Sequence, residues 1–373
     1  REKSNDMKVV RTFHPVGQGA FYTEVFLDQK GGQVVVYDCG TETGNKALQI
    51  PLDNQIDLFK NSFVRNQQID ILFISHFHAD HINGIDRLLA NVKVKATIIP
   101  MLDWATLILT RVRNFLQYYA NNPQFALNID RIIRELYLNG ENSERFGEVV
   151  IVSPDAEDEA EGNRQAKGNI IRTGKIIYTG SKIPLNEFWE YVPFNSITFN
   201  DHRAQDLLKG LMNLAGVTDP RQLDLEDLIR NRLDDVANEY KKAMNNANDN
   251  LYTLVVCSRP VAGILPQPCP RLSHCMYFGD FDCKQNSLLW GRFNKVFDYG
   301  EMGTVQVPHH GAKGNWRPEM GLGDPRHYIV STGSTNGHHH PSFWVLEDIW
   351  ENGHRPYVVS EKWQTRRDYD FTV

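Results

Sequence analysis

The sequence has no apolar run long enough to cross a membrane, and its cysteines show no spacing typical of a disulfide framework or a zinc ribbon. No stretch approaches about eighteen uninterrupted apolar residues. No signal peptide opens the chain either, so we expect a cytoplasmic protein without a membrane partner. The cysteines are scattered, which predicts free thiols in a reducing compartment. They are Cys39, Cys257, Cys269, Cys275 and Cys283.

The chain of 373 residues also lacks a long Lys/Arg run, and its formal net charge is −6. This charge does not predict tight binding of duplex nucleic acid, although it is compatible with a local basic groove. The apolar fraction of 41% is sufficient for a packed core. We therefore expect a single α/β domain over residues 7–373, with helical insertions at about 101–147 and 201–247.

An apolar run that ends in histidines and an aspartate is the most informative stretch of the sequence. The run 69–74 is short and rich in β-branched and aromatic residues, which predicts a buried strand, and 82–90 has the spacing of a helix. Metal-ligating residue types gather in the loop between them. Two of these, His76 and His78, are two positions apart in extended chain and point the same way. Such a cluster predicts the beginning of two metal sites. Its members are His76, His78, Asp80 and His81.

Three later predicted strands also end in potential metal ligands. The first is followed by Asp280, the second by His309 and His310, and the third by a run of three histidines that closes with His340 and a proline. Proline is favoured at the first position of a helix, so His340 is expected at the start of one. Because strand ends meet at one edge of a sheet, we expect these residues to lie near the first cluster.

Three other stretches each have two interpretations. Gly17-Gln18-Gly19 lacks the longer glycine pattern and the Lys-Ser/Thr of a phosphate loop, which favours a hairpin turn. The acidic stretch 155–162 predicts a solvated loop, with a divalent-cation site as the alternative. Aromatic residues of the first insertion predict its own core, with a base-stacking platform as the alternative. The insertions are expected to shape a substrate pocket or the face of a homodimer.

The pattern His76-x-His78-x-Asp80-His81 resembles the signature of the metallo-β-lactamase-fold hydrolases. The later order Gly-Asp, His-His-Gly and His-Pro is similar to one branch of that family, which includes the hydrolase domain of DNA-uptake channel proteins and the phosphorylcholine esterases. The resemblance implies a four-layer αββα sandwich and a hydrolase with two divalent metal ions. Asn83 and Ala312 depart from the family pattern, where glycine and serine are common.

The resemblance also implies two metal sites with one shared carboxylate. The ligands of the first ion would be His76, His78, Asp280 and His310. The ligands of the second ion would be Asp80, His81, Asp280 and His340. It leaves open which residue of the pair His309 and His310, and which of His338 and His340, binds metal.

Further roles follow from the same resemblance. Asp80 would be catalytic as well as a ligand, and His309 would contact the oxyanion or the leaving group of the substrate. Asp38 would orient a metal-bound histidine, or would cap a turn. Independently of the resemblance, Lys313 is a candidate for holding a substrate phosphate, with solvated surface charge as the alternative.

The expected cofactors are two divalent ions, with Zn²⁺ preferred for an imidazole-rich set and Mn²⁺ or Fe as alternatives. Such a pair lowers the pKa of a bridging water toward about 7, and the resulting hydroxide attacks the substrate. The expected function is therefore a phosphodiesterase that acts on a nucleotide, a single-stranded nucleic acid or a small phosphodiester. The alternatives are a lactam, lactone or thioester hydrolase on the same fold, or a catalytically idle metal-binding scaffold.

Overall fold

The computed structural model of the chain describes most of its residues. These are residues 7–28, 31–43, 50–64, 68–138, 144–154, 175–197, 201–245, 252–264, 270–284, 287–322, 324 and 326–373.

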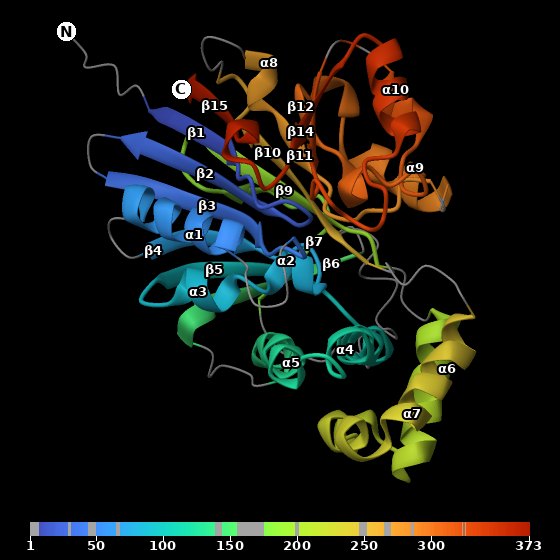
Figure 1. The fold of residues 1–373 in the computed structure, drawn as a ribbon. Helices are drawn as coiled ribbons and strands as arrows, with labels where there is room; N and C mark the ends of the chain where they lie inside the picture. Colours follow the sequence, from blue (N-terminus) through green and yellow to red (C-terminus); the bar gives the residue numbers. More distant parts are fainter. Residues whose placement is uncertain are drawn as a thin grey trace, which may run out of the picture.

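Two β-sheets stacked face to face form the centre of the molecule (Figure 1). Within the described residues, the first sheet has eight strands in the order β15-β1-β2-β3-β4-β5-β6-β7, and the second has seven in the order β14-β13-β12-β11-β10-β9-β8. The strands of the first sheet are β1 Lys8–Phe13, β2 Phe21–Asp28, β3 Gly31–Cys39, β4 Gln68–Phe73, β5 Lys93–Pro100, β6 Glu148–Ser153, β7 Lys175–Tyr178 and β15 Arg367–Thr372. The strands of the second sheet are β8 Ile183–Pro184, β9 Trp189–Asn195, β10 Leu254–Pro260, β11 Cys275–Tyr277, β12 Thr304–Gln306, β13 His327–Ser331 and β14 Arg355–Val359.

Parallel pairing directs several strand ends toward the same edge. In the first sheet β3 to β7 run parallel, and in the second β11 to β14 do. β1 and β2 are antiparallel neighbours, which confirms the hairpin expected at Gly17-Gln18-Gly19. β15 pairs with β1, which lies beside it in Figure 1, so Met7 and Val373 are hydrogen-bonded neighbours.

Large apolar side chains from both sheets fill the space between them. Alternate residues of each strand point inward, so the inner faces form one continuous core. Fully buried members are Phe13, Tyr22, Phe73, Trp189, Tyr277 and Ile329. One buried ion pair also lies there, where Arg11 Nε donates to Glu24 Oε1 at 2.5 Å. Glu24 accepts further hydrogen bonds from Tyr191, Ser258 and Tyr277 of the second sheet, so this pair joins the two sheets.

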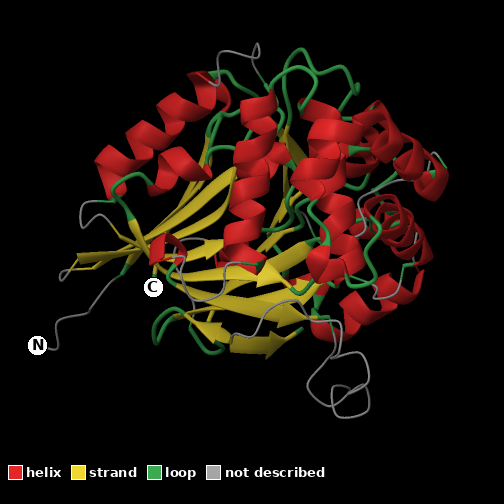
Figure 2. Ribbon diagram, turned by 90° about the horizontal axis from the view of Figure 1, so that it is seen from below, coloured by secondary structure: helices red, strands yellow, loops and turns green. Residues whose placement is uncertain are grey.

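Helices cover the outer faces of both sheets, and in the view from below those of the first sheet lie over its strands (Figure 2). The helices are α1 Ile50–Phe63, α2 Ala79–Ile82, α3 Ile85–Leu89, α4 Trp104–Tyr118, α5 Pro123–Tyr137, α6 His202–Ala215, α7 Leu225–Met244, α8 Pro270–Ser273, α9 Ser287–Val296 and α10 Phe343–Glu351. One buried cluster holds α1, α3 and α5 against the first sheet, and another holds α9 and α10 against the second. This layering confirms the αββα sandwich.

The helices predicted in the two insertions are present and pack on one another. The Asp103 side chain accepts from Thr106 N–H at the start of α4, and the Asp201 side chain accepts from Arg203 N–H at the start of α6. Both are favourable N-cap residues. Buried residues of α4, α6 and α7 then form one shared core below the first sheet in Figure 1. The two insertions, which are distant in sequence, therefore form one helical layer.

Some expectations differ from the structure. A single helix was expected over 82–90, but the structure has the two short helices α2 and α3, separated at Asn83 and Gly84. The Asn83 side chain forms hydrogen bonds with the backbone of Thr41. Gly84 packs against the Cys39 sulfur, so a Cβ at this position would have no room. α1 and α9 had no counterpart in the sequence analysis. The acidic stretch 155–162 lies outside the described residues. Among the described helices, none is long and apolar enough to span a membrane.

Candidate metal centre

Strand ends of both sheets bring six potential metal ligands together. β4 leads into His76, His78, Asp80 and His81, with the last two on α2. β11 leads through Gly279 to Asp280. Gly279 has φ +55°, and a Cβ there would lie 2.9–3.0 Å from the side chains of Thr253 and Ser75. Glycine is therefore required for the chain to pass this close to the site.

The six residues form two groups of three. The ligand atoms of one group lie within 4.8 Å of one another, and so do those of the other. All six residues are buried. The first group is His76, His78 and Asp280. The second group is Asp80, His81 and His310.

The Asp280 carboxylate lies between the two groups and presents one oxygen to each. Its Oδ2 is 3.4 Å from His76 Nε2 and 4.0 Å from His78 Nδ1. Its Oδ1 is 3.3 Å from His81 Nε2 and 3.9 Å from His310 Nε2. A carboxylate in this position can contact an ion in either group.

Asp38 and Ser75 orient two of these histidines. Asp38 Oδ2 accepts from Ser75 Oγ at 2.6 Å and from His81 Nδ1 at 2.7 Å. Because the Ser75 hydroxyl donates to Asp38, it accepts from His76 Nδ1 at 2.9 Å. In its neutral form each imidazole thus carries its proton on Nδ1, which leaves the Nε2 lone pair toward the centre. Ser75 was not predicted as a site residue, although its position directly before His76 was a signal.

Two consecutive histidines at the end of β12 face different groups. Both have left-handed backbones, His309 with φ +47° and His310 with φ +55°. His310 Nδ1 donates to Ser331 O at 2.9 Å, and its Nε2 lies 3.1 Å from Asp80 Oδ2. His309 Nε2 lies 3.5 Å from Asp280 Oδ2, the oxygen that faces His76 and His78.

The structure therefore groups His310 with Asp80 and His81, whereas the resemblance grouped it with His76 and His78. The reason is the left-handed backbone at both histidines, which directs the two neighbouring rings to opposite sides of Asp280.

Asn315 fixes the orientation of the His309 ring. Its amide nitrogen donates to Asp280 O at 3.1 Å, so its Oδ1 is the atom that accepts from His309 Nδ1 at 2.8 Å. The neutral His309 ring then has its lone pair on Nε2, toward Asp280. No sequence pattern marks Asn315, because its role depends on the turn after His310.

His340 and His338 lie beside the centre rather than in it. The His340 ring is 5.7 Å from that of His309 and 5.8 Å from that of His338, and neither His338 nor His340 belongs to the two groups. His338 is 63% exposed, and its Nε2 is 4.0 Å from Glu42 Oε2. Lys313 is exposed, with its Nζ 4.4 Å from the centre of the Trp344 ring.

Burial and neighbouring charges shift the pKa values of the three histidines in the first cluster. Burial and the neighbouring His81 lower the pKa of His76. For His81, burial opposes the charged form, but the surrounding carboxylates of Asp80, Asp280 and Asp38 raise its pKa well above 6.5. Burial and then the positive charge of Arg113, on α4, lower the pKa of His78 well below 6.5. Arg113 was not among the residues predicted for the site.

Three buried polar atoms test whether a metal fits. His76 Nε2, His81 Nε2 and Asp280 Oδ1 have no hydrogen-bond partner among the described residues. Unpaired buried polar atoms cost free energy, so such groups are normally satisfied. Here they converge as nitrogen lone pairs and carboxylate oxygens, the donor types that Zn²⁺ binds. The residues therefore fit a pair of divalent ions.

The αββα sandwich, with His and Asp groups at its strand ends, defines a protein of the metallo-β-lactamase fold. The family model described as the metallo-beta-lactamase superfamily matches residues 19–132, which include the first cluster of ligands. No curated protein matches the chain. The narrower resemblance to DNA-uptake and phosphorylcholine-esterase proteins stays a prediction.

Solved structures also match the chain at low identity. The metallo-beta-lactamase fold protein YhfI from Bacillus subtilis is 9% identical, with a TM-score of 0.39 over 98% of this chain and 100% of that one. The short form of human tRNase Z is 10% identical, with a TM-score of 0.38 over 94% and 92%. Unliganded yeast PDE1 is 11% identical, with a TM-score of 0.38 over 99% and 100%.

The described residues line two cavities of several hundred cubic ångströms. One of about 740 Å³ lies between α2 and the helices α4 and α5, and its wall includes Glu42, Asn83, Tyr118 and Phe125. Its wall also includes Ala79, directly before Asp80, and burial and then the Asp80 charge raise the pKa of Glu42.

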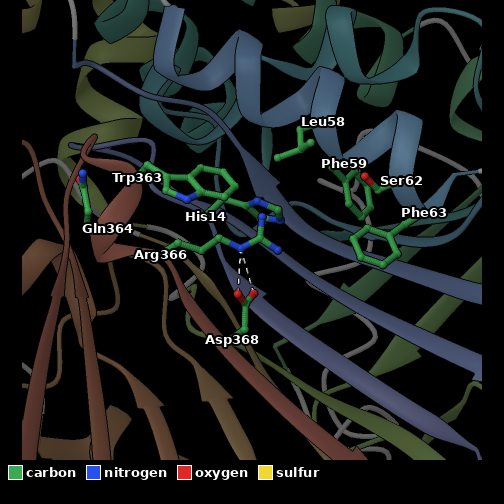
Figure 3. Close-up of a pocket in the computed structure, with 9 residues that line it drawn as sticks. All are labelled: His14, Leu58, Phe59, Ser62, Phe63, Trp363, Gln364, Arg366 and Asp368. Carbon is green, nitrogen blue, oxygen red and sulfur yellow. Dashed lines mark hydrogen bonds and ion pairs between the residues drawn. The ribbon is translucent and has the colours of Figure 1, made fainter.

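The other cavity has a volume of about 490 Å³ and lies between α1 and the segment 363–368 (Figure 3). Its wall includes Trp363 and the ion pair of Arg366 with Asp368. His14, buried beneath the cavity, belongs to the turn between β1 and β2.

Proposed function

We propose that this protein is a hydrolase that uses two divalent metal ions and acts on phosphodiesters. The single observation that carries the proposal is the position of Asp280 between two buried His/Asp groups, in which His76 Nε2, His81 Nε2 and Asp280 Oδ1 have no hydrogen-bond partner among the described residues. Zn²⁺ is the ion we assign, because imidazole nitrogens predominate. When bound, two such ions acidify a water and neutralise negative charge that develops on the substrate.

The donor atoms divide into two sets. One set surrounds Asp280 Oδ2 and consists of His76, His78 and His309 nitrogens at 3.4, 4.0 and 3.5 Å. The other surrounds Asp280 Oδ1 and consists of Asp80, His81 and His310. This division gives His309 and His310 one site each. It supports a ligand role for His309 in place of the oxyanion contact that the resemblance suggested, and it assigns no ligand role to His340.

The remaining side chains would bind and orient the substrate. Arg113 is close enough to lower the pKa of His78, and its guanidinium is suited to a phosphate oxygen. Asp80, whose carboxylate lies 3.1 Å from His310 Nε2, would be the catalytic carboxylate of the second site. The cavity beside α4 and α5 offers room for the group attached to the phosphate. The positive charge of Arg113 favours an anionic phosphodiester substrate over neutral lactams and lactones.

The experiment compares metal content and substrates. We expect two equivalents of tightly bound metal and hydrolysis of bis-p-nitrophenyl phosphate, with little turnover of nitrocefin, a lactone or a thioester. Asp280→Ala should lose both metal and activity, whereas Asp370→Ala, which removes a carboxylate on the distant β15, should lose neither. Preferential turnover of a carbon-centred substrate would contradict the phosphodiester assignment. Absence of bound metal in the wild type would contradict the hydrolase itself.

A further inference from the structure

Two aromatic side chains at the start of α10 are exposed to solvent. Phe343 is 71% exposed and Trp344 is 62% exposed, although large apolar side chains are normally buried. The helix itself is held firmly, because Val345 and Ile349 on its other face are fully buried against the second sheet. The exposed rings are therefore presented on a fixed element.

A cation accompanies one of these rings. Lys313 Nζ lies 4.4 Å from the centre of the Trp344 ring, within the range of a cation–π interaction. Lys313 comes from the turn after His310, whereas Trp344 comes from the helix after His340. An aromatic face and a positive charge thus lie side by side on the surface.

The pair lies next to the candidate metal centre. Ser342 N–H donates to Gly311 O at 2.9 Å, and a Cβ on Gly311 would lie 2.7 Å from Pro341. These contacts join the two histidine-bearing turns directly. Lys313 follows His310 by three residues and Trp344 follows His340 by four, so both belong to the segments that carry these histidines.

The combination of chemical groups matches one unit of a single-stranded nucleic acid. Every nucleobase offers a π face that stacks on an aromatic ring, at about 1–3 kcal/mol per base, and the adjoining phosphate pairs with a cation. A small phosphodiester has no second base to reach this surface. The net charge of −6 disfavours duplex binding, which depends on extended phosphate contacts.

The charge along α10 limits this surface to the start of the helix. Glu347 lies three residues from both Trp344 and Trp350, whereas Glu351 directly follows Trp350, which is 71% exposed. Carboxylates there repel a phosphate backbone. Trp350 is thus an equally exposed tryptophan of the same helix in an unsuitable environment, which makes it a matched control.

We propose that Trp344, Phe343 and Lys313 form a stacking platform for the base adjoining the bond to be cleaved, so that the substrate is a single-stranded nucleic acid. This inference rests on the proposed phosphodiesterase function. The aromatic platform considered in the sequence analysis was in the first insertion, where Phe115 is instead buried in the helical core.

Binding of labelled oligonucleotides tests the platform without turnover. Full-length protein in EDTA would be titrated against fluorescein-labelled oligo-dT and oligo-U of about ten nucleotides, with fluorescence anisotropy as the readout. We expect Trp344→Ala to weaken binding by about 5- to 100-fold, Trp344→Phe to retain most of it, and Trp350→Ala to match the wild type. Equal Kd values for Trp344→Ala and wild type, or an equal loss in Trp350→Ala, would overturn the proposal.

Kinetics separate this inference from the function on which it rests. With metal bound, Trp344→Ala should lower kcat/KM for the oligonucleotide at least about fivefold more than for bis-p-nitrophenyl phosphate. Equal losses on both substrates would overturn the platform while leaving the phosphodiesterase intact. If the wild type cleaves neither substrate, the proposed function fails, and the binding result alone decides the platform. A dimer-to-monomer change in sedimentation of Trp344→Ala, without a change in Kd, would indicate a second copy of the chain as the partner.

Discussion

Ser75 and Asp38 are joined by two hydrogen bonds, one from the Ser75 N–H to Asp38 Oδ1 at 2.7 Å and one from the Ser75 hydroxyl to Asp38 Oδ2 at 2.6 Å. The same carboxylate accepts from His81 Nδ1, and the same hydroxyl accepts from His76 Nδ1. One pair therefore fixes a histidine in each of the two groups, which makes it a positioning device for both metal sites at once.

Asp38→Asn is expected to weaken both sites. An amide in place of the carboxylate loses the charge that stabilises the Nδ1 proton of His81, and such changes typically cost about 10- to 100-fold in metal affinity. Competition with a chromophoric chelator would measure the change. Ser75→Ala should affect mainly the His76 side. Thr106→Ala, which removes a side chain outside the two ligand groups, is the control. Unchanged zinc affinity in Asp38→Asn would show that Asp38 only caps the end of β3.

The division of His309 and His310 between the sites predicts a change in metal stoichiometry. Each single alanine variant should retain about one tightly bound ion instead of two, because each removes one of three protein nitrogens or oxygens around one oxygen of Asp280. Elemental analysis after gel filtration provides the count. Asn315→Ala should resemble a weaker His309→Ala, since Asn315 holds the His309 ring. Two ions bound in His309→Ala would show that His309 is not a metal ligand and would support its contact with the substrate instead.

The ion pair between the sheets predicts a large stability effect. Glu24→Gln should destabilise the fold by about 3–5 kcal/mol, because it leaves the Arg11 charge buried without its partner. Urea denaturation would give the free energy of unfolding. Asp370→Asn, which breaks the exposed pair with Lys8, should cost less than about 1 kcal/mol. The double variant Arg11→Met, Glu24→Leu should have a larger free energy of unfolding than Glu24→Gln. Equal free energies would show that the destabilisation comes from altered packing and not from the unpaired charge.

His14 predicts a loss of stability in acid. Burial and then the charge of Arg366 lower its pKa from 6.5 to about 3. Between these values the unfolded chain binds a proton that the folded protein does not, so stability falls as the pH decreases from about 6.5 toward 3. The contribution is about 2 kcal/mol between pH 7 and pH 5, from 1.36 kcal/mol per pH unit below 6.5. Above pH 6.5 this stability is fully present.

The comparison of His14→Gln with wild type isolates this contribution. The free energy of unfolding of the variant should fall by about 2 kcal/mol less than that of the wild type over the same pH range. His202→Gln removes an exposed histidine at the start of α6 and should follow the wild type. A wild-type pH dependence that persists in His14→Gln would indicate that other buried groups dominate.

Much of the fold was predictable, because local patterns agree with the final packing. The apolar run before His76 became β4, and helical spacing with N-cap residues located α4 and α6. α1 was missed, although its buried residues Leu52, Ile56 and Phe59 have helical spacing. The single helix expected after His81 became two, because Asn83 bonds to Thr41, a partner distant in sequence.

The order of the motifs indicated which residues gather at the centre, but not how they divide. His309 and His310 are adjacent, so no spacing rule separates them, and their directions depend on two consecutive left-handed backbones. The positions of Ser75 and Arg113 likewise depend on contacts between segments that lie apart in sequence. His340, expected as a ligand, lies beside His309 at the rim.

The joint packing of α4 with α6 and α7 has a consequence for the history of the chain. Because Phe115 of the first insertion shares a core with Leu211 and Val236 of the second, deletion of either segment would expose the apolar face of the other. Relatives are therefore expected to have gained or lost the two segments in concert. A chimera that exchanges both should remain in solution, whereas one that exchanges a single segment should precipitate.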